Sequence, residues 1–281
     1  MTTPRVELPT IAVVGAGSMG RAIVAGLLAP NVDVQGGVRV TNRSVDRAAD
    51  FDAETRVTAF TTGSNPNANR EAVAGASIVV IGVKPAMVTD VLDEIADALD
   101  PSALIVSVAA GVTTRTMEAH LPGGHAVVRT MPNTPATIGR AVTGLSGGSR
   151  VTPEDLDVAV RLFETVGDVL VIEEDQIDAL GSLSGSGPAY VFYFIEQFMR
   201  VAEEKGFTRE QADRMVRGTF RGAIDLLDAS DETPQELRRR VTSPGGSTER
   251  AIAAFDDADV HHIFSLATDA AVARQREMGQ A

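Results

Sequence analysis

Three glycines near the N-terminus have the spacing of a loop that binds the phosphates of a dinucleotide. They form a G-x-G-x-x-G pattern within "VVGAGSMGRAIVAGLL", after a run typical of a strand and at the start of a helical pattern. Such glycines allow a tight turn, a close approach of backbone to a pyrophosphate and close packing of helix on strand. The free N–H groups of the helix N-terminus then face the pyrophosphate. We expect the loop to bind a dinucleotide cofactor through Gly15, Ala16, Gly17, Ser18, Met19 and Gly20.

The residues after the second expected strand favour NADP(H). NAD sites place Asp or Glu there, roughly 20 residues beyond the glycine loop, to bind the ribose hydroxyls. This chain has Asn42, Arg43 and Ser44 instead. Arg and Ser can hold a 2′-phosphate through charge-assisted hydrogen bonds. We therefore expect NADP(H) to be preferred, with NAD(H) as a possible cofactor; the alternative is that Arg43 is an ordinary solvated residue.

The segments after three further expected strands are suited to line a ligand site, because ligands bind at the carboxyl ends of parallel strands. They are "GVKPAM" with Val83, Lys84 and Pro85, "VAAGVT" with Ala109, Ala110 and Gly111, and "RTMPNTPA" with Asn133 between two prolines. Small residues let a ribose or ring lie close, and the prolines make a stiff wall. Each segment alone is better explained as an ordinary turn, whereas three on one edge favour a site.

A fourth segment, "VTSPGGSTERAI", is suited to bind a small anion. The Pro-Gly-Gly sequence forces a turn, and Ser247 is expected to cap a helix that begins at Thr248. Backbone N–H groups and hydroxyls then converge on a region the size of a carboxylate. We expect the substrate to be held there by Ser243, Gly245, Gly246, Ser247 and Thr248. The alternative is an ordinary capped helix after a turn.

Alternating strands and helices position these segments. Strands are expected over residues 10–17, 38–42, 77–85, 103–111 and 125–133, and helices over 19–28, 70–75 and 87–99. This alternation predicts an α/β domain with a doubly wound, mainly parallel sheet of the Rossmann type. Residues 141–148 and 167–174 are expected to be later strands, and a helix between them begins with Thr152 as N-cap and Pro153 at the first position.

The chain is expected to be entirely helical after residue 173. Residues 187–206 predict one long helix whose aromatic side chains lie on more than one face, so a partner subunit could supply part of their burial. The next helix starts with a capping box from Thr208 to Gln211, and another box is expected from Thr233 to Glu236. We expect a dinucleotide-binding domain over 1–173 and a helical substrate-binding and dimerisation domain over 174–281.

Composition excludes several classes of protein. The chain has 281 residues, no cysteine and a net charge of −13, which argue against a disulfide scaffold, thiolate catalysis, a Cys-based zinc site and nucleic-acid binding. No metal is expected. No apolar run is long enough for a membrane span and the start lacks a signal-peptide pattern, so a cytoplasmic protein is expected. Only Lys84 and Lys205 are lysines, which fits either a GC-rich genome that favours Arg codons or an acidic surface adapted to salt.

Together these motifs resemble pyrroline-5-carboxylate reductase over nearly the whole length. "VGAGSMG", "TNRS", "GVKP", "VAAGVT", "RTMPNTPA", "LSGSGPAYVF" and "VTSPGGST" occur in the family's order and spacing, and the last three are specific to it. The resemblance implies an N-terminal Rossmann domain, a helical domain that interlocks with a second subunit, and a homodimer or a ring of dimers. It implies an NAD(P)H-dependent enzyme that makes L-proline from 1-pyrroline-5-carboxylate.

The resemblance also implies roles for particular residues. Asn69 is similar to an Asn near the adenine end, and Val83, Lys84 and Ala110 correspond to residues along the ribose and nicotinamide. Ser243, Gly246, Ser247 and Thr248 match the carboxylate clamp, and Glu174 resembles an acid near the substrate nitrogen. The chain departs from the pattern at Ser247, often Thr or Ala, and at Arg240, which is Asn in some members.

The implied reaction passes a hydride from the nicotinamide to an imine carbon. Because the protonated imine is already electrophilic, positioning of the two reactants supplies most of the catalysis. Glu174 would favour the protonated imine, and Thr248 or a water could donate a proton to a neutral one. Thr248 and Lys84 are the candidate catalytic residues. The alternatives are another NADP-dependent imine reductase, a β-hydroxyacid reductase, and a non-enzymatic NADP(H) sensor that lacks the substrate clamp.

Overall fold

The computed structural model describes residues 5–51 and 53–280, and it divides into two compact units. The first unit runs to Ser186 and includes the segment from Ala271 onward; the second is Gly187–Ala270. The division therefore falls later than the expected domain boundary at 173, and the end of the chain returns to the first unit. Residues 1–4, residue 52 and residue 281 lie outside the described residues.

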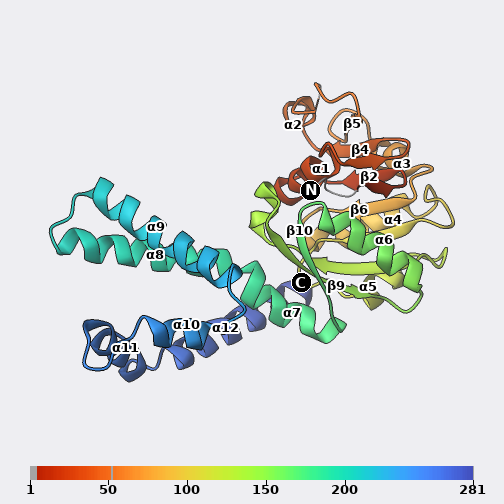
Figure 1. Cartoon of the computed structure of the whole chain (residues 1–281). Coiled ribbons are helices and arrows are strands. Elements are labelled where there is room, and N and C mark those ends of the chain that lie inside the picture. The colour runs from red at the N-terminus through yellow and green to blue at the C-terminus, as the bar shows by residue number, and fades with distance from the viewer. Residues whose placement is uncertain (1–4, 52, 281) are drawn as a thin grey trace. The chain divides into compact units, whose positions relative to one another are not determined.

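The first unit contains an eight-stranded sheet (Figure 1), in the order β10-β9-β8-β7-β6-β2-β4-β5. Its strands are β2 (Ile11–Val14), β4 (Val38–Asn42), β5 (Val57–Thr61), β6 (Ile78–Ile81), β7 (Leu104–Ser107), β8 (Val127–Met131), β9 (Ala141–Gly147) and β10 (Gly167–Val171). All neighbours are parallel except β8 and β9. The mainly parallel, doubly wound sheet is confirmed.

Helices cover both faces of this sheet. They are α1 (Ser18–Leu27), α2 (Val45–Ala49), α3 (Ala68–Val73), α4 (Val88–Ile95), α5 (Thr114–Ala119), α6 (Pro153–Glu164) and α7 (Ile177–Leu180). Short 3₁₀ turns are η1 (Pro85–Met87), η2 (Thr134–Ile138) and η3 (Glu174–Gln176), and η4 (Gly181–Gly185) is a π-helical turn. As expected, α6 has Thr152 as N-cap and Pro153 in its first turn.

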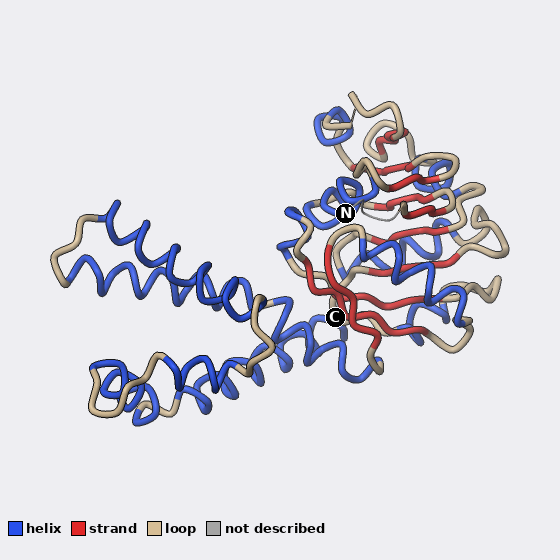
Figure 2. The backbone as a smooth tube through the Cα atoms, viewed as in Figure 1, coloured by secondary structure: helices blue, strands red, loops and turns tan. Residues whose placement is uncertain are grey.

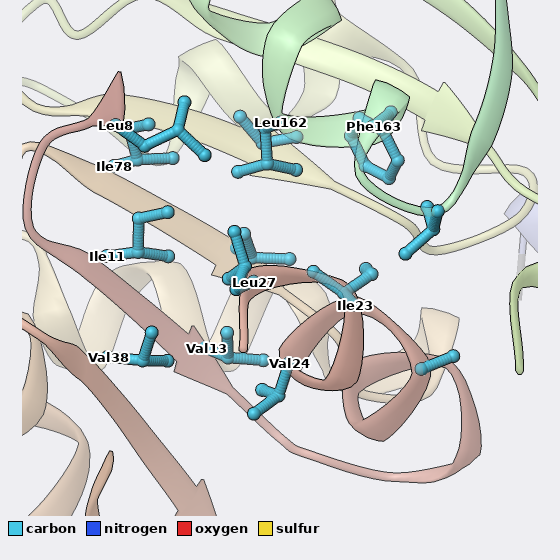
Figure 3. Packing of buried hydrophobic residues seen from close by; sticks show 14 of the residues in the cluster. Leu8, Ile11, Val13, Ile23, Val24, Leu27, Val38, Ile78, Leu162 and Phe163 are labelled. Atoms are coloured by element: carbon cyan, nitrogen blue, oxygen red, sulfur yellow. The ribbon is translucent and has the colours of Figure 1, made fainter. Parts of the chain in front are cut away.

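Alternate residues of the buried strands feed two separate cores. Ile11 and Val13 of β2 pack with Ile23 and Leu27 of α1 (Figure 3), together with side chains of α6. Ala12 and Val14 belong to the opposite core, which contains side chains of α4 and α5. Because both faces are covered, β2 reads as a continuous apolar run, as parallel strands do. The packing fixes the carboxyl end of β2, where the glycine loop begins.

Three strands were not expected from the sequence. β5 extends the sheet beyond β4, while β1 (Val6–Leu8) and β3 (Val32–Val34) form a separate parallel pair. The pair packs against the core of α1 and α6 through Leu8 and Val32. Three-residue strands carry too short an alternation to be recognised from sequence.

Among the described residues, the second unit contains helices and loops but no strand (Figure 2). Its helices are α8 (Gly187–Glu204), α9 (Arg209–Asp228), α10 (Pro234–Arg240), α11 (Ser247–Asp257) and α12 (Val260–Gln280), the last of which continues into the first unit. The Thr208–Gln211 capping box is confirmed. Thr233 accepts a hydrogen bond from Glu236 N, the first half of the second expected box.

The aromatic face of α8 is exposed in the single chain. Phe192 is 65% exposed and Tyr193 is 60% exposed, while Ala202 is the helix's one buried residue among those described. Phe194 and Phe198 contact other rings, those of Phe264 and Phe220, yet both remain partly exposed. The burial expected for this helix is therefore not supplied within one chain.

Candidate functional site

The glycine loop joins β2 to α1 with an open helix N-terminus. Gly15 has a φ of +87°, and a Cβ there would lie 2.7 Å from Val83 Cγ1, so this position requires glycine. Gly17 is the N-cap of α1, with no side-chain cap and no heavy atom within 4 Å of a built Cβ. Ala16 N donates to Thr41 O at 2.9 Å, which ties the loop to β4. The first N–H groups of α1 are thus available to an anion.

A cavity of about 590 Å³ lies beside this loop. It is lined by Gly15, Thr41, Asn42, Arg43, Thr62, Gly63, Pro66, Asn69, Val83, Met87, Asp90, Val91 and Glu94. Five of these were expected to bind the cofactor: Gly15, Asn42, Arg43, Asn69 and Val83. The structure therefore brings these five residues together from four separated segments of the chain at the carboxyl edge of the sheet.

The segment after β4 presents a cation to the cavity. Asn42 is 5% exposed and its Nδ2 donates to Arg47 O at 3.4 Å, so it holds the turn into α2. Arg43 is exposed and lines the cavity, and Ser44 is the N-cap of α2 without a side-chain capping bond. A phosphate at this turn would meet the Arg43 guanidinium and the Ser44 hydroxyl.

A second cavity of about 550 Å³ borders the start of α1. It is lined by Gly17, Ser18, Arg21, Ala22, Ala25, Arg47 and Thr137. Arg21 forms an ion pair with Asp50. Gly17 and Ser18 therefore border a different cavity from Gly15. A pyrophosphate at this loop would contact the backbone N–H groups at the start of α1.

Other expected cofactor residues after β6 and β7 line neither cavity in the part of the chain that the structure describes; these are Lys84, Pro85, Ala109, Ala110 and Gly111. Lys84 is exposed and precedes η1, with Pro85 at its first position. Ala109 N donates to Ser107 Oγ at 3.2 Å, and Gly111 has a φ of +77°. Their predicted places along the ribose and nicotinamide stay predictions, as do those of Met19, Gly20 and Ala110.

Asn133 fixes the proline-flanked loop. Its Oδ1 accepts from Val142 N at 2.9 Å, and its Nδ2 donates to Ser184 O and Ser184 Oγ at 3.1 Å each. Asn133 is 8% exposed, and its hydrogen bonds are satisfied within the first unit. The loop is therefore held against the π-helical turn η4, as a stiff wall requires.

Glu174 is engaged on both carboxylate oxygens. Oε1 accepts from Thr114 N and Oε2 from Thr114 Oγ1, each at 2.7 Å, at the start of α5. Oε1 also lies 3.7 Å from Arg129 Nη1, and Arg129 Nη2 donates to Asp178 at 2.5 Å. The Arg129 side chain is only 4% exposed. This network explains Glu174 as a residue that joins β8, α5 and η3, and its role near a substrate nitrogen stays a prediction.

The expected anion-binding turn precedes α11, but the expected cap is wrong. The N-cap is Gly246 rather than Ser247, and the helix begins at Ser247. Gly245 has a φ of +70°, and its N–H donates to Glu249 Oε2 at 2.9 Å. A carboxylate from the first turn of the helix thus does part of the capping that we expected of the Ser247 hydroxyl.

Two of the expected donors are used within this turn. Gly246 N donates to Ser243 O at 2.9 Å, and Gly245 N is held by Glu249. In the described chain, no hydrogen bond occupies the Ser247 and Thr248 N–H groups or the hydroxyls of Ser243, Ser247 and Thr248. These groups remain available for a small anion.

Sequence reasoning missed the acidic side of the first cavity. Met87, Asp90, Val91 and Glu94 lie on one face of η1 and α4, at spacings of three and four residues. The helix was expected, but which of its faces would meet the cavity was not considered. Thr62 and Gly63 were missed because they follow β5, a strand that was not expected.

The glycine loop and the first cavity beside it fit a dinucleotide. The cavity volume is in the range of cofactor sites, Arg43 supplies a cation, and Gly17 leaves the approach to the α1 N-terminus open. Among the described residues no group of three or more His, Cys, Asp or Glu could hold a metal ion, and no helix is long and apolar enough to cross a bilayer.

Comparison with known proteins identifies the family. Residues 174–278 match the model for pyrroline-5-carboxylate reductase dimerisation, and residues 10–111 match that for NADP oxidoreductase, coenzyme F420-dependent. The pyrroline-5-carboxylate reductase of Corynebacterium melassecola is 36% identical over 97% of this chain and 100% of that protein. This chain belongs to the pyrroline-5-carboxylate reductase family.

Solved pyrroline-5-carboxylate reductases share the fold over almost the whole chain. The Coxiella burnetii structure has a TM-score of 0.86 and 36% identity, covering 96% of this chain and 98% of that one. A Plasmodium falciparum pyrroline carboxylate reductase, solved with NADP bound, has a TM-score of 0.82 and 25% identity over 96% and 98% of the two chains. The expected fold and family are confirmed.

Membership of the pyrroline-5-carboxylate reductase family agrees with the NADP(H) expectation, since the N-terminal match is to an NADP oxidoreductase model. The dimerisation match begins at residue 174, where the second domain was expected to start, although the compact helical unit begins at Gly187. The segment between them, with η3, α7 and η4, thus belongs by sequence to one region and by packing to the other.

Proposed function

We propose that this chain reduces the C=N bond of 1-pyrroline-5-carboxylate to give L-proline, the last step of proline biosynthesis, with NADPH as the preferred cofactor. The observation that carries the proposal is the match to pyrroline-5-carboxylate reductases over 97% of the chain. The open glycine loop and the unoccupied donors before α11 support it, because the reaction needs both a dinucleotide and a carboxylate site.

The first unit would hold the cofactor. The loop Gly15–Gly20 and the N-terminus of α1 bind the pyrophosphate, and Asn42, Arg43 and Ser44 bind the 2′-phosphate. Asn69 lies toward the adenine, and Val83, Lys84, Pro85 and Ala109 to Gly111 lie toward the nicotinamide. When bound, NADPH supplies a hydride to the imine carbon. Lys84, exposed at the start of η1, adds a positive charge at this edge of the sheet.

The turn before α11 would hold the substrate carboxylate. The N–H groups of Ser247 and Thr248 point from the first turn of α11, and the Ser243 and Thr248 hydroxyls add two donors. Fixing the carboxylate fixes the ring, so that the reaction gains mainly from orientation. The Thr248 hydroxyl is the proton donor to a neutral imine, and Glu174 favours the protonated form.

We also propose that two copies pair through the helical unit. Large apolar side chains on α8 and α12, including Phe192 and Leu266, are more than half exposed in the single chain. On α9, built Cβ atoms at Gly218 and Gly222 meet nothing within 4 Å, so a helix could approach closely there. Exposed apolar surface of this kind is characteristic of interfaces. We propose further that such dimers can assemble into rings.

A cytoplasmic location and an acidic surface suited to high salt complete the proposal. The chain has no cysteine for disulfide formation and carries a net charge of −13. Salt screens such a surface and would keep it compact and soluble.

The test of activity is a spectrophotometric assay. The purified full chain is mixed with NADPH and 1-pyrroline-5-carboxylate at low and high salt, and nicotinamide absorbance is followed while proline is quantified. Proline formation in step with NADPH loss supports the reductase, and a rate that rises with salt supports the acidic-surface proposal. Measurable NADPH binding without turnover, at any salt and with NADH as well, would favour a sensor.

The test of assembly is light scattering during gel filtration. We expect the wild-type mass to be that of a dimer or a multiple of it, and Phe192→Glu or Leu266→Glu to shift it to the monomer. Glu203→Gln, an exposed polar change near the end of α8, serves as the control. A monomeric wild-type protein would overturn the dimer proposal.

A further inference from the structure

A buried amide at the wall of the first cavity has one partner too few. Asn69, in the first turn of α3, is 8% exposed and lines the cavity beside Glu94. Its Nδ2 donates to Glu94 Oε2 at 3.0 Å. Its Oδ1 is screened from water and accepts no hydrogen bond. Buried carbonyl oxygens are normally satisfied, so this oxygen calls for a donor.

Glu94 decides which end of the amide is left unpaired. An ionised carboxylate only accepts hydrogen bonds, whereas an Asn amide has a donating and an accepting end. Asn69 must therefore present Nδ2 to Glu94, which leaves Oδ1 as an acceptor. Turning the amide over would set two oxygens against each other and is excluded by the same chemistry.

Glu94 is itself held in place by the neighbouring helix. Arg70 Nη1 donates to Glu94 O at 2.9 Å, and Arg70 also forms a two-pronged ion pair with Asp97. This hydrogen-bonded pair holds the pKa of Asp97 below its usual value. The link between α3 and the end of α4 thus fixes the Glu94 backbone, and through it the Asn69 amide.

We propose that Glu94 is a positioning residue that makes Asn69 Oδ1 an acceptor for a hydrogen-bond donor on the adenosine half of the cofactor. The inference rests on the proposed binding of NADP(H). Where the 2′-hydroxyl is phosphorylated, two donors remain on this half, the 6-amino group of adenine and the ribose 3′-hydroxyl. Because Oδ1 is screened from solvent, the proposal requires the cavity side chains around it to move when the cofactor binds. Glu94 therefore adds selectivity for the adenosine half that the phosphate contacts alone do not provide.

The experiment uses calorimetry on the full chain with three ligands: adenosine 2′,5′-bisphosphate, inosine 2′,5′-bisphosphate and the 3′-deoxy analogue of the first. Inosine replaces the amino group by an oxygen, and the 3′-deoxy compound lacks the hydroxyl. We expect the wild-type protein to bind one of the two analogues about tenfold or more weakly, which identifies the donor. Equal binding of all three ligands, within about twofold, would overturn the inference without any variant being made.

Glu94→Gln tests the positioning role. A Gln amide can donate as well as accept, so Asn69 becomes free to turn over, and the preference for the adenosine ligand should fall to less than about threefold. The matched control is Glu71→Gln, since Glu71 accepts from Asn65 Nδ2 at 3.0 Å but does not line the cavity. It should leave the preference unchanged. An unchanged preference in Glu94→Gln would overturn the role of Glu94.

Turnover with NADPH, measured in parallel, separates this inference from the proposed function. Normal turnover without ligand discrimination removes the inference alone. Failure of adenosine 2′,5′-bisphosphate to bind the wild-type protein would count against both the inference and the preference for NADPH.

Discussion

The Glu249 carboxylate accepts a hydrogen bond from the Gly245 N–H, at 2.9 Å, in the turn that we propose as the carboxylate clamp. The chain therefore places one of its own negative charges within a few residues of the donors meant for the substrate. Gly245 has a left-handed backbone conformation, with a φ of +70°. The hydrogen bond to Glu249 stabilises this turn because it gives the Gly245 N–H a partner. The same charge opposes a second carboxylate nearby.

Glu249→Gln should lower the KM for 1-pyrroline-5-carboxylate by roughly fivefold at low salt, corresponding to about 1 kcal/mol of relieved repulsion. The Gln side chain keeps an acceptor for Gly245, so the turn is retained. The difference between variant and wild type should shrink as salt rises. Glu236→Gln, an exposed carboxylate paired with Arg239, is the control. A raised KM would mean that the Glu249 charge supports the clamp instead of opposing its ligand.

Arg43→Ala should raise the KM for NADPH by about tenfold or more, because a charge-assisted bond to the 2′-phosphate is lost. NADH lacks this phosphate and serves as the internal control; its KM should change by less than about twofold. Initial rates with both cofactors measure the effect. Equal changes for NADPH and NADH would contradict the assignment of Arg43 to the phosphate.

Gly15→Ala should weaken the binding of NADPH and NADH alike. A Cβ at this position is strained by the φ of +87° and would lie 2.7 Å from Val83 Cγ1, so the loop would have to move. Gly75→Ala is the matched control, since Gly75 has a φ of +68° but open space around a built Cβ. It should cost about 1–2 kcal/mol of stability without changing affinity. Fluorescence titration with each dinucleotide measures the affinities. If Gly15→Ala bound both cofactors as tightly as the wild type, the assignment of this loop to the pyrophosphate would be contradicted.

Arg129→Met should lower the free energy of unfolding by about 3–5 kcal/mol, because it leaves Asp178 and Glu174 without their buried cation. Denaturant titration measures this loss. Arg161→Met removes an exposed pair with Asp157 and should cost less than about 0.5 kcal/mol. If Arg129→Met lowered the free energy of unfolding no more than Arg161→Met does, the Arg129 network would contribute little to joining β8 to η3.

The sequence was sufficient to predict the central strands and the glycine loop, because β2 and β6 are continuous apolar runs with strong turn signals on either side. It was not sufficient for the edges. β5 is only partly buried, and the reversal of β9 relative to β8 leaves no mark in the pattern of either strand. The Gly- and Ser-rich turn η4 has no periodicity from which a π-helix could be inferred.

Within the site, residue types were easier to predict than contacts. Arg43 and Asn69 were expected and do line the cavity, whereas Glu94 was missed because its importance depends on an amide 25 positions away in the chain. The cap of α11 was misplaced for a similar reason. Ser247 has a hydroxyl that can cap a helix, but the N-cap is Gly246, and the Glu249 carboxylate accepts the hydrogen bond from Gly245 N. Side chains with several possible partners need a structure to choose between them.

The end of the chain returns to the unit where it began. A Cβ built on Gly181 would lie 2.6 Å from Gln275 Oε1, and Gln275 is 7% exposed, so α12 at Gln275 packs against the start of η4. The helical unit is therefore an insertion within the first unit rather than an appendage. A stop codon after Ser186 would remove this closing segment, and a chain shortened in that way would lack part of its own nucleotide-binding unit. Separating the two units cleanly requires excising Gly187–Ala270 and rejoining the flanks.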